Sequence, residues 1–314
     1  METATPAKQE SKLVEGVPHV HPNTWDKSDG RFEVQTWLEK VPQGRLKATD
    51  YGIPEHKREP HPVLFDDPLV NQVVKMDLAS FLSGEHHSYE YSAKMMLIAP
   101  DETSQMFLAT QTIDEARHFE IFCRRLADYG VSPENRTKLM KRYLLPATQK
   151  MMDLMDEQAD KKNFVGCVIA QNLILEGMAY PVYRYETKYW SRFDPGLSHI
   201  IEGAFADEVH HTHFGEVYLR DYFAGDIKAK NESQKLVYQF HKLMTEVFES
   251  FIRQYIGLYQ EAVDGHKDLL GDIEIFPGML MANVTEEEQT RILLSEIQKD
   301  YKRCLDLIGL QAEA

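Results

Sequence analysis

Two pairs of a glutamate and a histidine recur with the same internal spacing along this chain. Glu115 is followed three positions later by His118, and Glu208 is followed three positions later by His211. Residues at i and i+3 of an α-helix share one face, so each pair presents a carboxylate beside an imidazole. One such pair also fits a solvated helix surface. The second pair makes a site with two metal ions the better interpretation.

A further glutamate precedes each pair at a similar distance. Glu85 lies thirty residues before Glu115, and Glu176 lies thirty-two residues before Glu208. The midpoints of these intervals, residues 100 and 192, fall at or just before breaks that contain proline and aspartate. Two antiparallel helix hairpins would therefore bring the acids to one level, each about 22 Å from its turn at about 1.5 Å per residue.

Two hairpins of this kind, packed as a four-helix bundle, predict a dinuclear metal site lined by four carboxylates and two imidazoles. Burial of four carboxylates without cations is prohibitively costly, so the pattern requires metal ions. Oxygen and nitrogen ligands suit two iron ions, or one manganese and one iron, more than structural zinc. The predicted metal ligands are Glu85, Glu115, His118, Glu176, Glu208 and His211.

Residues next to the ligands are candidates for supporting roles. Asp114 and Asp207 each precede a ligand glutamate, and each can accept the second ring N–H of a ligand histidine from the neighbouring helix. Arg117 can balance their negative charge. The predicted catalytic residues are therefore Asp114, Asp207, Arg117 and Tyr180.

Helical phase also predicts which side chains line a pocket beside the metals, because residues three or four positions from a ligand share its face. A redox role is open for Tyr89 and for Tyr180. The predicted pocket residues are Phe81, Gln111, Phe122, Asn172, Phe205 and Thr212.

The wider pattern predicts an all-α fold with little strand. Apolar residues at helical spacing predict helices at about 67–99, 102–129, 134–157, 161–190, 196–224, 232–263 and 286–308. Segments rich in Pro, Gly, His and charge predict that residues 1–64 are a polar tail and an extended arm that wraps on the surface. Residues 65–314 then form one helical domain, with the metal site within 66–225.

Composition excludes several other classes of protein. A formal net charge of −15 over 314 residues argues against a nucleic-acid surface. The three cysteines, Cys123, Cys167 and Cys304, are widely spaced and predict neither a disulfide framework nor a thiolate site. The polar N-terminus has no apolar core of a secretory signal, and no stretch of about 18 apolar residues predicts a membrane span. We expect a soluble cytoplasmic protein.

Four short motifs give the chain a resemblance to known proteins. They are FLSGE ending at Glu85, IDEARH ending at His118, LILEGM ending at Met178 and ADEVHH ending at His211. Over residues 66–225 the chain resembles the ferritin-like dinuclear carboxylate superfamily. It is similar there to the ribonucleotide-reductase-small-subunit-like ligand-binding oxidases and to the bacterial multicomponent monooxygenase hydroxylases. The resemblance implies a ferritin-like four-helix bundle with additional helices, a diiron or manganese–iron centre, dioxygen chemistry and a homodimer.

The chain departs from these relatives at four positions. Ser88 and Gln171 stand where the ligand-binding oxidases form a Val–Tyr cross-link, so that link cannot form. Phe122 stands where reductase subunits commonly carry the radical tyrosine, although some manganese–iron subunits also have Phe there. Tyr180 replaces the threonine to which a proton-relay role is assigned in the hydroxylases.

These observations predict a monooxygenase or oxidase that activates dioxygen and oxidises a small organic substrate beside Tyr180 and Phe122. No flavin, nucleotide or Fe–S fingerprint is evident, so we expect an external electron donor. A radical-generating subunit of the ribonucleotide-reductase type is the first alternative. An iron-binding ferroxidase or storage protein is the second, and it would assemble into a cage.

Overall fold

The fold is described here from a computed structural model, which places residues 49–50 and 53–311. Long helices dominate these residues, as the all-α prediction requires, and the strands among them form two short antiparallel pairs. The longer helices are α3 (Pro68–Ile98), α4 (Glu102–Asp128), α5 (Pro133–Tyr143), α6 (Pro146–Asp160), α8 (Glu176–Phe193), α9 (Pro195–Gly225), α10 (Ile227–Gly265) and α12 (Glu286–Ile308).

Aspartate residues set the starts of three helices that build the site. The side chain of Asp67 accepts from the backbone N–H of Leu69 before α3, and Asp101 accepts from Ser104 before α4. Asp194 accepts from Leu197 before α9, and both α3 and α9 begin with proline. Such N-caps satisfy backbone donors that a helix leaves unpaired, so the turns between the hairpin helices are fixed locally.

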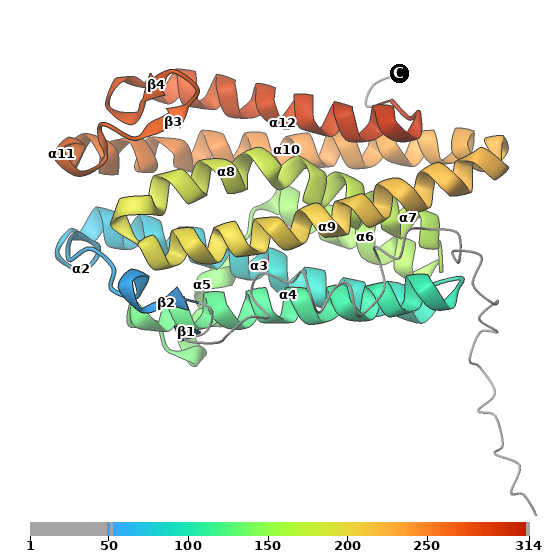
Figure 1. Cartoon of the computed structure of the whole chain (residues 1–314), viewed down its shortest axis with the longest axis horizontal. Coiled ribbons are helices and arrows are strands. Elements are labelled where there is room, and N and C mark those ends of the chain that lie inside the picture. The colour runs from blue at the N-terminus through green and yellow to red at the C-terminus, as the bar shows by residue number, and fades with distance from the viewer. Residues whose placement is uncertain (1–48, 51–52, 312–314) are drawn as a thin grey trace, which may run out of the picture.

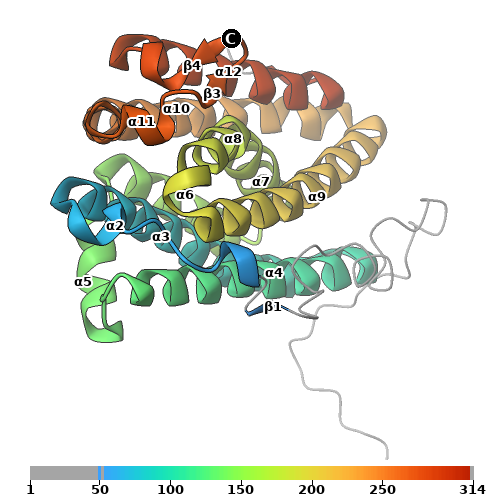
Figure 2. The ribbon, with the colours of Figure 1, turned by 60° about the vertical axis from the view of Figure 1, so that its left-hand side comes forward.

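The four central helices form two hairpins. α3 packs along α4, and α8 packs along α9, while α4 and α9 also meet (Figure 1). α10 and α12 add a further layer that packs against α8 on the side away from α4 (Figures 1 and 2). A continuous apolar core runs through all of these helices. The architecture confirms the predicted ferritin-like bundle with additional helices.

Two predicted helices differ from those observed. The helix expected at 134–157 is divided into α5 and α6, because Pro146 begins a new helix and cannot continue the previous one. The helix expected at 161–190 begins at α7 (Phe164–Val168), after an Asn163 cap, and widens into a π-helical segment, η3 (Ile169–Leu175), before α8. π-Helical turns occur mostly as single-turn bulges inside α-helices, and they are frequent at functional sites.

The short elements lie before α3 and between α10 and α12. Most of the predicted arm, 1–64, lies outside the described residues. Its described part packs on α9 and includes the backbone N–H of His61, which donates to Phe193 at 2.7 Å. The short elements are β1 (Thr49–Asp50), β2 (Ile53–Pro54), η2 (Glu55–Lys57), α2 (Val63–Asp66), α11 (Lys267–Leu270), β3 (Glu274–Phe276), β4 (Met279–Leu280) and η4 (Met281–Asn283).

One stretch among the described residues has the length and hydropathy of a membrane span, contrary to the sequence-based expectation. It is Phe164–Phe193, whose most apolar window has a mean hydropathy of 1.3 and is 78% buried inside the molecule. The stretch is apolar because it runs through the middle of the bundle, between α9 and the layer of α10 and α12.

Candidate metal centre

The structure brings the six predicted metal ligands together inside the four-helix core. Glu85 comes from the middle of α3 and Glu176 from the first residue of α8, and each of the other two helices contributes one pair. All six side chains are buried. The pairs, from α4 and α9 respectively, are Glu115 with His118 and Glu208 with His211.

The ligand atoms form two overlapping groups in which all atoms lie within 4.8 Å of one another. One group joins Glu85 and His118 to two shared glutamates, and the other joins Glu176 and His211 to the same two. The shared residues are Glu115 and Glu208. The overlap means that Glu115 and Glu208 would be available to both of two metal ions bound here.

Both histidines turn the same ring atom toward the carboxylates. His118 Nδ1 lies 3.4 Å from Glu85 Oε2, and His211 Nδ1 lies 3.3 Å from Glu208 Oε2. The opposite ring atoms face aspartates across the bundle, with His118 Nε2 3.2 Å from Asp207 and His211 Nε2 3.4 Å from Asp114. An aspartate there selects the tautomer that leaves Nδ1 free to bind a metal.

Arg117 connects the two supporting aspartates. Its Nη2 atom donates to Asp114 Oδ1 at 2.6 Å and to Asp207 Oδ2 at 3.1 Å. Each aspartate supports the histidine of the opposite hairpin, so one guanidinium holds both supports. All three residues were predicted from their positions beside the ligands.

Glu176 is held by a separate amide network. Gln111 from α4 and Gln171 from η3 each donate to Glu176 Oε1 at 2.8 Å. Asn172, also in η3, donates to Gln111 Oε1 at 3.0 Å. The π-helical turn thus supplies two of the three amides around this ligand, and Asn172 also approaches the backbone carbonyl of His211 at 3.3 Å.

Without a cation nearby, the buried cluster cannot easily hold several ionised glutamates at once. Burial raises the pKa of Glu85 to about 8 and also raises the pKa of Glu176 and of Glu208. Burial alone lowers the pKa of His118 and of His211, but the surrounding acids raise both well above the usual value. Without metal, the imidazoles must therefore serve as the counter-cations of the carboxylates.

The donor set fits metal binding. Glu115 Oε1 and His118 Nδ1 are buried and have no hydrogen-bond partner. Buried polar atoms are normally paired, so two orphans that face the same cluster indicate positions meant for a ligand. Mixed carboxylate and imidazole donors suit iron and manganese.

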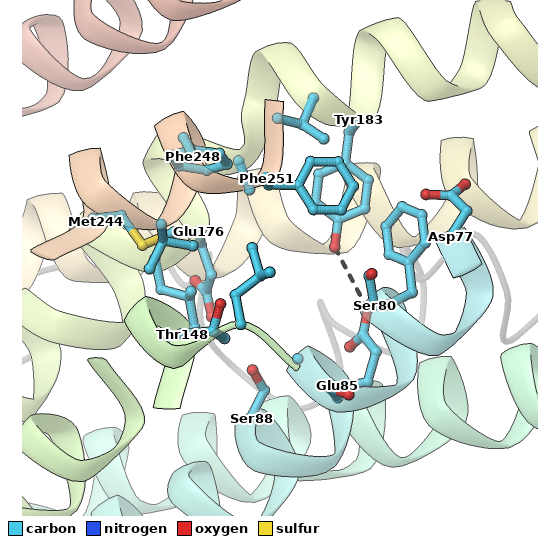
Figure 3. Close-up of a pocket in the computed structure, with 18 of the residues that line it drawn as sticks. Asp77, Ser80, Glu85, Ser88, Thr148, Glu176, Tyr183, Met244, Phe248 and Phe251 are labelled. Atoms are coloured by element: carbon cyan, nitrogen blue, oxygen red, sulfur yellow. Dashed lines mark hydrogen bonds between the residues drawn. The ribbon is translucent and has the colours of Figure 1, made fainter. Parts of the chain in front are cut away.

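A cavity of about 200 Å³ adjoins one side of the centre (Figure 3). Three predicted ligands, Glu85, Glu176 and Glu208, lie in its wall, whose surface is otherwise mostly apolar. Tyr183 also lines it and donates its O–H to Glu208 Oε1 at 3.3 Å and to Glu85 Oε1 at 3.5 Å, the latter marked in Figure 3. Sequence reasoning missed Tyr183, although it lies seven residues after Glu176 on the same helical face.

Of the six predicted pocket residues, Phe81 lines the cavity and the other five lie outside its wall. Phe122 is buried behind Phe81, with stacked rings 4.8 Å apart. Phe205 stacks on Tyr183 at 5.8 Å. Gln111 and Asn172 belong to the Glu176 network, and Thr212 is buried on α9. Helical phase identified inward-facing residues but not the side of the centre on which the cavity opens.

The two tyrosines for which the sequence left a redox role open do not line the cavity. The Tyr180 hydroxyl donates to the backbone carbonyl of Glu208 at 3.4 Å, so it faces the α9 backbone and not the cavity. Tyr89 lies near the surface, with its ring against Phe119 at 5.7 Å.

The fold and this centre together define a ferritin-like protein with a buried dinuclear carboxylate site. A family profile described as long-chain fatty aldehyde decarbonylase matches residues 75–253, which is more than half of the chain and includes all six ligands; the chain belongs to that family. No curated protein sequence matches the chain.

A solved structure supports the fold. It is described as protein 19 with aldehyde deformylating oxidase activity from Synechococcus, and it matches with a TM-score of 0.53 and 18% identity. The match covers 79% of this chain and 94% of that chain. At this level of identity the likeness concerns the fold alone.

Proposed function

We propose that this protein is a diiron oxidoreductase that uses dioxygen to remove the carbonyl carbon of an aldehyde. The observation that carries the proposal is the cavity, because it is mostly apolar and yet includes three of the six candidate ligands in its wall. A hydrocarbon chain fits the apolar surface, and its aldehyde group would lie at the carboxylates. The family description and the name of the Synechococcus protein both support an aldehyde as the substrate class.

The six ligands would hold two iron ions, with Glu115 and Glu208 shared between them. Bound iron would supply the redox chemistry that reduces dioxygen, and a manganese–iron pair suits the same ligands. Tyr183 holds a proton on its hydroxyl at the boundary between cavity and ligands. Phe248 and Phe251 of α10 also line the cavity and add to its apolar surface (Figure 3).

Conversion of an aldehyde and dioxygen into a hydrocarbon one carbon shorter, formate and water consumes four electrons and three protons. The electrons must come from a donor, and we propose an external reductase or a reducing cosubstrate. A homodimer and a cytoplasmic location complete the proposal, with no nucleic acid or membrane as partner.

The test uses the full chain loaded with iron, a chemical reductant with a mediator, dioxygen, and either hexanal or hexadecanal. We expect pentane or pentadecane in equal amount to formate, and no product from the iron-loaded chain in the absence of reductant. Consumption of aldehyde to the carboxylic acid alone would overturn removal of the carbonyl carbon. The absence of any aldehyde turnover, with iron bound, would overturn the substrate class.

The two alternative functions make different predictions. A radical-generating subunit would give a persistent radical signal in electron paramagnetic resonance, and the position usual for its tyrosine holds Phe122, which is fully buried and stacked on Phe81. A storage protein would elute as a cage-sized particle and accumulate many iron ions per chain. Either result, without aldehyde turnover, would replace the proposal.

A further inference from the structure

The cavity beside the metal centre is small for a long-chain substrate. Its volume is about 200 Å³. An apolar protein cavity of about 150 Å³ binds benzene, so about 25 Å³ serves each carbon atom. The cavity therefore has room for about eight non-hydrogen atoms, whereas hexadecanal has about seventeen and would need roughly twice the volume.

The length of the cavity gives the same number of atoms. Glu85 lies at the metal centre and Asp77 lines the cavity away from it (Figure 3). Asp77 precedes Glu85 by eight residues on α3, or about 12 Å along the helix at about 1.5 Å per residue. An extended chain advances about 3.6 Å for every three bonds, so eight atoms span about 8.5 Å. A van der Waals contact of about 3.5 Å at the end of the chain completes the distance.

The cavity is closed at Asp77 by hydrogen bonds that join three helices. Trp190 Nε1–H of α8 donates to Asp77 Oδ2 at 2.6 Å, and the Tyr259 hydroxyl of α10 donates to Asp77 Oδ1 at 2.7 Å. Trp190 and Tyr259 are buried outside the cavity wall, and both rings pack against Tyr189. A hydrocarbon cannot replace these hydrogen bonds, so a longer chain would gain little by forcing the helices apart here.

α10 forms one long wall of the cavity. Four of its residues line the cavity at the spacing of a single helical face, namely Met244, Val247, Phe248 and Phe251. The Phe251 ring also packs against Tyr255, with ring centroids 5.1 Å apart. Protein interiors are close-packed and yield little, so this wall cannot swell to admit a longer chain without cost.

We propose that the cavity limits the substrate to a medium-chain aldehyde of about seven carbons, and that Phe251 is one of the residues that set this limit. The inference rests on the proposed function, because it assigns the length of the same substrate. The carbon chain and the aldehyde oxygen together supply the eight atoms for which the cavity has room. The family is described by a long-chain fatty aldehyde, so this chain would differ from that description in the length of its substrate.

Binding shows the limit without turnover. Primary alcohols from propanol to decanol, which match the aldehydes in length, are titrated by calorimetry into the full iron-loaded chain, kept free of dioxygen. Affinity should rise about fourfold with each methylene up to heptanol, the factor that burial of one methylene contributes, and should then rise no further. A rise that continues unchanged to decanol would overturn the length limit.

Two variants should move the limit in opposite directions. Phe251→Ala removes the ring from the cavity wall, so affinity should keep rising to decanol. Ala179→Leu enlarges another residue that lines the cavity by three carbons, so the limit should fall to about butanol. A limit that stays at heptanol in both variants would place the alcohols outside this cavity and contradict the inference.

Ile252→Ala is the matched control. Ile252 follows Phe251 on α10 and is buried, but it does not line the cavity. Its truncation should lower stability and leave the limit at heptanol. A limit that moves in this variant as far as in Phe251→Ala would mean that any loss of packing in α10 suffices, and Phe251 would lose its assigned role.

Turnover separates this inference from the proposed function. With iron, reductant and dioxygen, hexanal should be converted much faster than hexadecanal. Equal rates for the two aldehydes would overturn this inference and leave the proposed function standing. No turnover of either aldehyde, with the binding limit at heptanol intact, would overturn the proposed reaction and leave the limit on the length of the ligand.

Discussion

The molecule buries acidic side chains in two places, and the two places balance their charge differently. At the metal centre four carboxylates face two imidazoles, and burial raises the pKa of Glu85 to about 8. The second place is the Asp77–Glu186 pair, formed by Asp77 of α3 and Glu186 of α8. Trp190 and Tyr259 donate to Asp77 there, and burial raises the pKa of both acids. Of the two places, only the centre contains imidazoles whose ring nitrogens point at carboxylates, which is the donor set that suits iron and manganese.

The comparison shows that burial of acids alone does not identify a metal site. Nitrogen ligands, shared carboxylates and supports behind the histidines mark the centre, and the pair has none of these. Variants at the metal centre should not change how Asp77 makes stability depend on pH. Variants of the Asp77–Glu186 pair should not change the binding of metal.

The largest effect is expected from Glu115→Ala combined with Glu208→Ala, because both carboxylates belong to both ligand groups. The unaltered chain should bind about two iron ions and the variant none. Iron should raise the melting temperature of the unaltered chain only, since a ligand that binds the folded state stabilises it. Metal analysis and thermal unfolding check this, and stoichiometric iron in the variant would return these residues to a structural role.

Asp77→Asn should change the dependence of stability on pH. Asp77 has a folded pKa of about 6 against an ordinary value of 3.8, so the folded chain prefers the protonated acid. As pH rises through this window, the unaltered chain should lose up to about 3 kcal/mol of unfolding free energy that the variant does not lose. The gap between them should therefore shrink from pH 4 to pH 7 in urea unfolding of the metal-free chain.

Asp264→Asn provides the control for that comparison. Asp264 is exposed, and a hydrogen bond from Lys267 lowers its pKa, so its effect on stability should have the opposite sign and be small. A gap of the same size and direction in both variants would show that the response does not come from the buried pair.

Asp207→Asn should weaken metal binding without abolishing it. Asp207 supports His118 and accepts from Arg117, and loss of such a support typically costs roughly 10–100-fold in affinity. Competition with a chelator measures the change. Glu120→Gln, an exposed residue of α4 that pairs with Arg124, should leave the affinity unchanged. Equal affinities for all three chains would remove Asp207 from the metal support.

The smallest effect is expected from Tyr183→Phe. The hydroxyl makes only long contacts of 3.3 and 3.5 Å to two ligands, so stability should fall by about 1 kcal/mol with full metal content. If the hydroxyl serves the reaction, turnover of hexanal should fall more than in Tyr180→Phe, whose hydroxyl faces backbone. Equal turnover in both variants would confine Tyr183 to a structural role.

The ligand set was accessible from sequence because the repeat combines three constraints: residue type, i and i+3 spacing, and equal distance from a turn. These constraints fixed the bundle and brought together the six residues that the structure places at the centre. They also indicated the aspartates, since a residue next to a ligand on α4 or α9 turns toward the neighbouring helix.

The cavity was much less predictable. Its wall includes Met244 and Phe248 of α10, which are far from every motif in the sequence. The Asp77 partner Tyr259 is separated from it by 182 positions, and no local pattern links them. Gln111 and Asn172 face inward as expected, but hydrogen bonds to Glu176 and to each other direct them to the ligand. These contacts depend on how helices that are far apart in the sequence pack against one another.

Arg117 has a consequence that reaches beyond either aspartate. Because its Nη2 atom contacts both Asp114 and Asp207, it ties together the supports of His118 and His211. A shift of one histidine on metal entry would therefore act on the support of the other through this guanidinium. We therefore expect the two metal positions to be coupled: loading of one should change the affinity of the other, and by linkage the factor is the same in both directions.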